Sequence, residues 1–131
     1  MFVDSSAFVA ILVVETDADE LALKLKGVNA IMTSPLARYE TSLGIARVLK
    51  INPEDAASVV NRLLLHYGIR TINITEEIGA AATLAFSRYG KGRHEAKLNM
   101  GDCFSYACAR VHRVALLCKG DDFVHTDIRI A

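Results

Sequence analysis

The sequence predicts an α/β protein in which helices cover both faces of a central, mostly parallel sheet, an α/β/α sandwich formed by one domain over residues 1–131. Short apolar runs alternate with longer helical patterns, which is typical of strands joined by helical crossovers. The chain is 52% hydrophobic, which at this length is enough to bury a substantial core. It contains no internal repeat, linker or low-complexity run that would divide it.

The first elements are predicted from apolar runs. Residues 1–4 are expected to form a buried strand, and the helix over 5–14 follows with Asp4 or Ser5 as its N-cap. Residues 17–26 show a polar-faced helical pattern, in which three leucines are expected to be partly buried: Leu21, Leu23 and Leu25. Residues 30–34 are the second strand candidate.

Prolines and glycines mark the ends of the middle elements. Ser34-Pro35 begins a helix that runs to about residue 50, since serine is a preferred N-cap and proline suits the first helical position. Pro53 begins the next helix, which ends near Gly68. Residues 70–74 are a β-branched strand candidate. The helix that begins at Thr75 is expected to stop at Gly90.

The last third completes the alternation. Residues 90–100 are expected to form a polar loop, 101–113 a helix, and 114–118 a strand. Residues 126–130 are expected to form a last short strand. Parallel strands of this kind gather the residues that follow them at one edge of the sheet.

Composition excludes several classes of protein. The chain has Lys+Arg 15 and Asp+Glu 15, so it does not bind nucleic acid through bulk positive charge. It shows neither a signal-peptide pattern nor a membrane-length apolar stretch, so no membrane association is expected. Its three cysteines lie in or beside apolar segments, as buried thiols of a cytoplasmic protein do, and have no zinc-binding spacing.

Acidic residues stand where the predicted fold can bring them together. Asp4 ends the first apolar run, Glu40 lies beside the apolar stripe of its helix, and Asp102 opens another helix. Asp121 and Asp122 follow the strand at 114–118. Carboxylates gathered at one sheet edge are suited to holding a divalent metal ion against a phosphate. Two hydroxyls beside the first acid are candidates for holding a metal-bound water: Ser5 and Ser6.

Each acid also has a purely structural explanation. Asp4 is a natural N-cap, and Asp102 with Asn99 forms a variant of the capping box. Glu40 shares its stripe with Leu36 and Leu43 and has Arg47 as a candidate partner two turns on. Asp-rich turns after strands are routine.

Several motifs resemble those of the PIN-domain ribonucleases, in particular the VapC toxins of toxin–antitoxin pairs. The similarity spans the whole chain, and its last two motifs together are specific. The matching segments are 2–7 (FVDSSA), 39–41 (YET), 90–94 (GKGRH), 98–106 (LNMGDCFSY), 119–123 (KGDDF) and 126–128 (TDI).

This resemblance implies a Mg²⁺- or Mn²⁺-dependent endoribonuclease site, a homodimer and a cognate antitoxin that blocks the site. Transfer RNA or ribosomal RNA is the implied substrate. Carried over by position, four residues form the catalytic acidic set: Asp4, Glu40, Asp102 and Asp122. Asp4 and Asp102 are the expected metal ligands. The resemblance leaves open whether Asp122 or Asp121 is the fourth acid, because the family often has another residue where this chain has Asp121.

A basic cluster precedes Asp102. It is either a solvated loop or a clamp on the phosphate backbone of RNA, and it consists of Arg88, Lys91, Arg93, His94 and Lys97. Apolar surface on the helices at 5–14 and 53–67 is a candidate partner or dimer face. Two other functions are consistent with the same residues: a non-catalytic binding module whose acids are caps and surface pairs, and a DNA-directed metal nuclease.

Overall fold

Four short parallel strands form the centre of the molecule, as the sequence predicted. The computed structural model describes residues 1–131. Its strands are β1 (Phe2–Val3), β2 (Met32–Thr33), β3 (Arg70–Thr71) and β4 (Leu116–Leu117). They lie in the order β3-β2-β1-β4, and every neighbouring pair is parallel. The carboxyl ends of all four strands therefore meet at one edge of the sheet.

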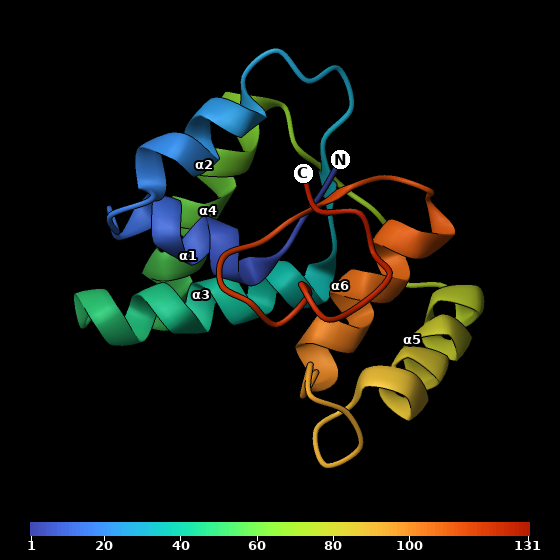
Figure 1. Ribbon diagram of the computed structural model, residues 1–131. Helices are drawn as coiled ribbons and strands as arrows, with labels where there is room; N and C mark the ends of the chain where they lie inside the picture. The colour runs from blue at the N-terminus through green and yellow to red at the C-terminus, as the bar shows by residue number, and fades with distance from the viewer.

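Six helices surround the sheet (Figure 1). They are α1 (Ser5–Leu12), α2 (Ala18–Leu25), α3 (Pro35–Leu49), α4 (Pro53–Tyr67), α5 (Glu76–Tyr89) and α6 (Met100–Val111). Five begin at a side chain that accepts a backbone N–H, as the polar residues before them favour: Asp4, Ser34, Asn52, Thr75 and Asn99. No helix combines the length and the apolar character that crossing a bilayer would need.

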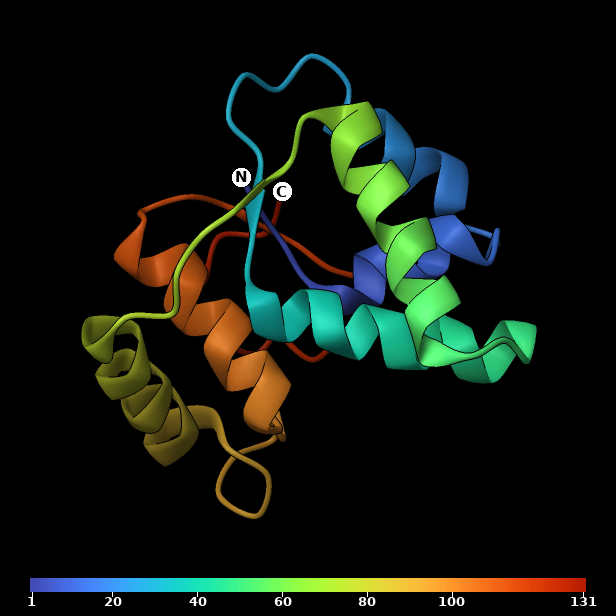
Figure 2. The ribbon, with the colours of Figure 1, turned by 180° about the vertical axis from the view of Figure 1, so that it is seen from behind.

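The strands face two separate hydrophobic cores. Phe2 and Leu116 pack into a core shared with α5 and α6, whereas Val3 and Leu117 pack into one shared with α1 to α4. Successive strand residues point to opposite faces, so β1 and β4 each contribute one side chain to each core. Figures 1 and 2 show α5 and α6 together on one side and α1 to α4 on the other. This confirms the α/β/α sandwich.

Three local predictions are wrong. Leu23 is 64% exposed, because only Leu21 and Leu25, one helical turn apart, face the core. Leu43 is 41% exposed, since the buried stripe of α3 runs instead through Ala37, Thr41 and Ile45. Residues 126–130 form no strand.

The segment after β4 nevertheless reaches the sheet through a single bridge between Leu116 and Ile130. The N–H of Ala131 donates to the carbonyl of Leu116 at 2.9 Å. This single isolated bridge does not extend into a ladder, so residues 126–130 are not a strand. The bridge brings the last residues beside β4, and both ends of the chain lie close together in Figures 1 and 2.

The loop between α5 and α6 is more ordered than its polar sequence predicted. Leu98 is fully buried and its N–H donates to the carbonyl of Tyr89 at 2.9 Å, while Lys91 N–H donates back to Leu98 at 3.0 Å. A bridge between Gly90 and Leu98 thus closes the loop at its base. The charged residues between them project from this closed loop.

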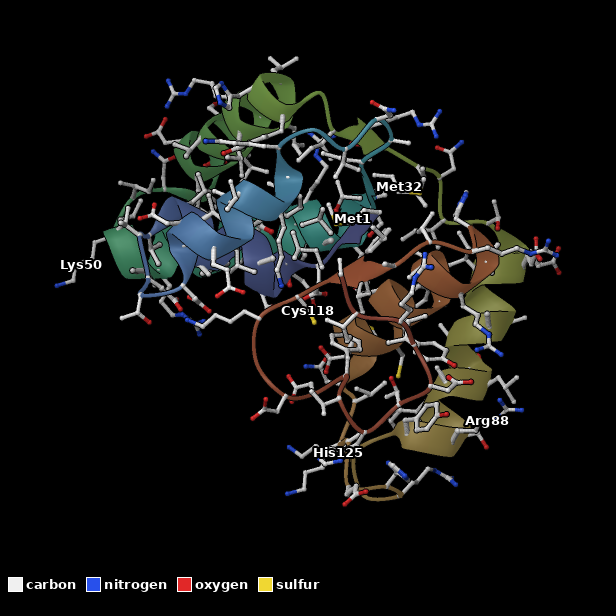
Figure 3. The ribbon with its side chains drawn as sticks, turned by 45° about the horizontal axis from the view of Figure 1, so that its top comes forward. Met1, Met32, Lys50, Arg88, Cys118 and His125 are labelled. Carbon is white, nitrogen blue, oxygen red and sulfur yellow. The ribbon has the colours of Figure 1, made fainter.

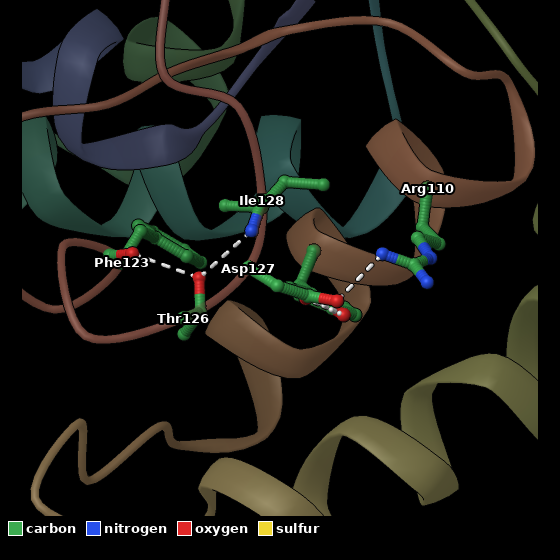
Figure 4. Close-up of polar contacts among 6 residues, drawn as sticks. Arg110, Phe123, Thr126, Asp127 and Ile128 are labelled. Atoms are coloured by element: carbon green, nitrogen blue, oxygen red, sulfur yellow. Dashed lines mark hydrogen bonds and ion pairs between the residues drawn. The ribbon is translucent and has the colours of Figure 1, made fainter.

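The loop that follows β4 is held from its far end (Figure 4). Asp127 accepts hydrogen bonds from the Tyr106 hydroxyl and from Arg110, the latter at 2.8 Å, and both donors lie on α6. Phe123 is 2% exposed and packs into the core on the α6 side. The Thr126 hydroxyl donates to the Phe123 carbonyl at 2.8 Å. Asp121 and Asp122 therefore belong to a loop anchored on both sides.

Candidate active site

Asp4 is held at the carboxyl end of β1. Its backbone N–H donates to Leu117 of β4 at 2.9 Å, and its side chain is 3% exposed. One carboxylate oxygen, Oδ2, accepts from the Ser6 N–H at 2.9 Å and from the Ser6 hydroxyl at 2.6 Å. The predicted cap role is therefore confirmed. It uses one oxygen only, and Oδ1 makes no hydrogen bond.

Glu40 reaches the site from the middle of α3. Its carboxylate accepts the Ser5 hydroxyl at 3.3 Å and forms no ion pair, so Arg47 is not its partner. Burial raises the pKa of the Glu40 carboxyl, and the nearby negative charge of Asp4 raises it further. The Ser5 hydrogen bond opposes both effects. This acid is thus half-buried beside another acid with no cation to balance it.

Gly101 explains how Glu40 comes so close to α6. A Cβ placed on Gly101 would lie 2.0 Å from Glu40 Oε1 and 2.7 Å from Oε2. The Glu40 carboxylate therefore occupies the space that any other residue at position 101 would fill. Analysis of the sequence did not identify Gly101 as part of the site. The sequence feature that could have indicated it is a glycine in the first turn of a helix, directly before an acidic residue.

Asp102 lies in the first turn of α6 and forms the predicted capping box. Its Oδ2 accepts from the Asn99 N–H at 2.8 Å, and the Asn99 side chain accepts from the Asp102 N–H at 3.0 Å. Burial raises the pKa of Asp102 from its ordinary value of 3.8 to about 6, against the lowering effect of the Asn99 hydrogen bond. The charges of Asp4, Asp122 and Glu40 raise it further.

Asp121 and Asp122 are both exposed on the loop after β4. The charge of Asp122 acts on Asp102 and on the Cys118 thiol, whereas Asp121 contributes to neither. Asp122 also directly precedes the buried Phe123, and the backbone at Asp121 closes a turn by accepting the N–H of Val124 at 3.1 Å. The electrostatic environment therefore favours Asp122 as the fourth member.

The charges of the other three acids act on Asp102, but the four do not form a closed cage. No group of three or more Asp, Glu, His or Cys side chains is placed to hold one ion directly. Mg²⁺ needs only one or two direct carboxylates and keeps several of its waters. Asp4 and Asp102 each have a carboxylate oxygen without a hydrogen bond, and both are hard oxygen donors. The residues present therefore fit a hydrated divalent cation.

Cys118 directly follows β4 and is labelled in Figure 3. Burial, followed by the charges of Asp4 and Asp122, raises the pKa of its thiol to about 12. The thiol is therefore protonated at neutral pH and is a poor nucleophile and a poor metal ligand. The groups at this edge that can bind a cation are therefore the oxygen atoms of the carboxylates and hydroxyls.

The basic residues before Asp102 differ in exposure and in their contacts. Arg88, Lys91, Arg93 and Lys97 are exposed, and the Arg93 guanidinium lies over the Phe86 ring at 5.9 Å. His94 is partly buried, and its Nδ1 accepts the Ala96 N–H at 3.1 Å, so it shapes the loop. On the loop after β4, His125 Nδ1 lies 3.6 Å from Glu95 Oε1; His125 is labelled in Figure 3.

Comparison with known proteins agrees with this architecture. The PIN domain family model matches residues 1–129. Ribonuclease VapC42 of Mycobacterium tuberculosis is 39% identical over 133 residues, covering 100% of this chain and 98% of the relative. Ribonuclease VapC30 of the same organism is 36% identical over 128 residues, covering 98% and 95%. The chain therefore belongs to the PIN-domain family and, within it, to the VapC ribonucleases.

Two solved structures share the fold. The crystal structure of Mycobacterium tuberculosis VapC20, described as a sarcin-ricin loop cleaving toxin, has a TM-score of 0.77 at 18% identity and covers 99% of this chain and 97% of its own. A toxin-antitoxin complex from Klebsiella pneumoniae has a TM-score of 0.71 at 19% identity and covers 99% and 95%. At these identities the likeness concerns the fold alone.

Proposed function

We propose that this chain is a metal-dependent endoribonuclease, the toxin of a toxin–antitoxin pair. The observation that carries the proposal is the convergence of Asp4, Glu40 and Asp102 with Asp122 at the carboxyl edge of the sheet, where the pKa of Asp102 rises to about 6. Helix capping alone does not require these carboxylates to lie close enough to raise one another's pKa. Membership of the VapC ribonucleases supports RNA as the substrate.

The acids have different roles in this proposal. Asp4 and Asp102 would hold Mg²⁺ or Mn²⁺ through the oxygens that their caps leave free. A bound divalent ion lowers the pKa of a water molecule and offsets charge on the phosphate. Glu40, whose raised pKa makes it a better proton acceptor, and Asp122 orient water around Asp4 and Asp102. Ser5 keeps Glu40 in place through its hydroxyl.

Dependence on a divalent metal is the first expected result. Purified protein treated with EDTA should lose RNA cleavage, and Mg²⁺ or Mn²⁺ should restore it. Ca²⁺ should restore it poorly, because its larger and more variable coordination relaxes the octahedral geometry. Cleavage that persists in excess chelator would refute the metal mechanism. Matched RNA and DNA substrates in the same assay separate an endoribonuclease from a DNA-directed nuclease.

The neighbouring acids of the last loop should differ in their effect. Asp122→Asn is expected to slow cleavage at least tenfold, because the charge of Asp122 acts on Asp102. Asp121→Asn should slow it less than threefold, with the residue acting through water or a neighbouring base. Single-turnover cleavage rates at saturating metal measure both variants. A larger loss for Asp121→Asn would reverse the assignment.

The exposed cations between α5 and α6 are proposed to contact the RNA backbone. Arg93→Gln combined with Lys97→Gln should weaken RNA binding and reduce the slope of log Kd against log salt by roughly one unit per lost phosphate contact. Lys50→Gln, directly after α3, and Arg62→Gln, on α4, are both at exposed positions and form the matched control pair. An unchanged slope would mean that the loop only faces solvent.

Partners follow from the same proposal. The substrate is proposed to be a transfer or ribosomal RNA, cleaved in the cytoplasm by a homodimer that a cognate antitoxin inhibits. Several large apolar side chains outside the site offer surface for these contacts, among them Leu65 at 81% exposed and Met100 at 65%. Light scattering of the purified protein tests the dimer. Coexpression with the protein encoded by the adjacent reading frame tests the antitoxin.

A further inference from the structure

Lys119 joins the loop after β4 to the turn between α1 and α2. Its ammonium group pairs with Glu15 and lies 3.1 Å from Asp17 Oδ1. The three side chains are each about one third exposed, at 32%, 35% and 33%. Asp17 Oδ1 is buried and has no hydrogen bond of its own. A buried carboxylate oxygen needs a counter-charge, and only Lys119 supplies one here.

The backbone of Lys119 leads from these ion pairs to Asp4. Its N–H donates to the Ser6 hydroxyl oxygen at 3.0 Å, and the Ser6 hydroxyl donates to Asp4 Oδ2 at 2.6 Å. A backbone N–H can only donate, so the Ser6 oxygen accepts from it and the single hydroxyl proton is directed to Asp4. The position of residue 119 therefore decides which way Ser6 points.

We propose that Lys119 is a positioning residue for the nuclease site. Its ion pairs with Glu15 and Asp17 fix the backbone at position 119, which orients the Ser6 hydroxyl toward Asp4 Oδ2 and leaves Oδ1 for the cation. The inference rests on the proposed function. Lys119 itself touches neither Asp4 nor the other acids of the site.

Simple electrostatics predicts the opposite result, which makes the inference testable. Removing a positive charge near a cation site should strengthen cation binding through the Coulomb interaction. Loss of positioning should weaken it, because Asp4 would no longer be held with one oxygen free. The direction of the change in metal affinity therefore distinguishes positioning from a general effect of charge.

The experiment compares Lys119→Met, which keeps much of the side-chain length without its charge, with Lys119→Arg and with Lys26→Met. Lys26 is exposed and forms no ion pair, so its variant controls for the loss of one lysine. Calorimetry measures the affinity for Mn²⁺ without RNA, and a cleavage assay follows at fixed Mn²⁺. Lys119→Met should bind Mn²⁺ at least fivefold more weakly and cleave at least tenfold more slowly. Raised Mn²⁺ should restore part of the rate.

Lys119→Arg is expected to stay within about twofold of the unmodified protein, since guanidinium also pairs with carboxylates. Lys119→Met could fail to fold, because it leaves Glu15 and Asp17 facing each other. The double variant Asp17→Asn, Lys119→Met removes one charge of each sign, so the local net charge is unchanged and electrostatics alone predicts no change in affinity; it should show the same weakened Mn²⁺ binding. Affinity in folded Lys119→Met or in the double variant equal to that of Lys26→Met, or tighter, would overturn the inference.

The measurements also separate this inference from the proposed function. Mn²⁺ binding by the unmodified protein without RNA cleavage would reject the ribonuclease proposal, while the affinities would still decide the role of Lys119. Cleavage by the unmodified protein that Lys119→Met retains in full would reject only the positioning role.

Discussion

Neutralising either cap carboxylate should abolish RNA cleavage without unfolding the protein. Asp4→Asn and Asp102→Asn are expected to reduce the cleavage rate at least a hundredfold, because each removes a charged oxygen ligand from the proposed cation site. Asparagine keeps an oxygen that can accept the capping N–H, so α1 and α6 should still begin where they do. Circular dichroism and single-turnover cleavage measure the two effects separately.

The stability of Asp102→Asn gives a second, independent measurement. Because the pKa of Asp102 is raised to about 6 in the folded protein, the ionised carboxylate destabilises the metal-free fold above that pH. The penalty is absent below about pH 3.8, where the group is protonated in both the folded and the unfolded state. The variant should therefore melt several degrees higher than the unmodified protein at pH 7.5. Near pH 4 the difference should disappear.

The size of this gain is about 1 kcal/mol after allowance for the partial exposure of the carboxyl group. Adding Mg²⁺ should stabilise the unmodified protein and leave the variant unchanged, since only the former binds the ion tightly. Asp55→Asn, at the exposed first turn of α4, is the matched control for losing a helix-terminal carboxylate. Variants that unfold, or folded variants that cleave at the full rate, would show that these acids are structural.

The fold could be predicted from the sequence because the residues that mark helix starts agreed with the pattern of apolar runs. Ser34-Pro35, Asn52-Pro53 and Asn99 place helix starts within a residue of where the structure has them. The strand predicted at 126–130, which the structure does not form, shows the limit of such signals. Its residues have strand-like character, but only the last of them lie against β4, because Asp127 is hydrogen-bonded to Tyr106 and Arg110 on α6.

The acidic site was predictable in part. Asp4 stands directly after a strand, Asp102 at a helix start and Asp122 in the loop after the last strand, so topology brings them toward one edge. Glu40 lies in mid-helix, and its approach to α6 depends on the missing side chain of Gly101, a contact between positions far apart in the chain. The link from Lys119 through Ser6 to Asp4 likewise needs three-dimensional distances.

Replacing Gly101 with alanine should reduce activity strongly while the protein keeps its stability. The added Cβ would lie 2.0 Å from Glu40 Oε1 and must displace it. Glu40 is a flexible side chain, so its carboxylate can rotate away at little cost to the fold. Alanine is also favoured over glycine within a helix by up to about 1 kcal/mol. The expected result is a melting temperature that is unchanged or higher, with cleavage at least tenfold slower.

Two comparisons assign this loss to Glu40. Gly79→Ala, on α5, has nothing within 4 Å of the added Cβ and should gain stability without losing activity. In a Glu40→Ala background, Gly101→Ala should cause no further loss of cleavage, because the displaced carboxylate is already gone. Additive losses would mean that Gly101 acts on RNA or on Asp102 directly. Full activity in Gly101→Ala, beside an inactive Glu40→Gln, would show that the Glu40 carboxylate works equally well from another position.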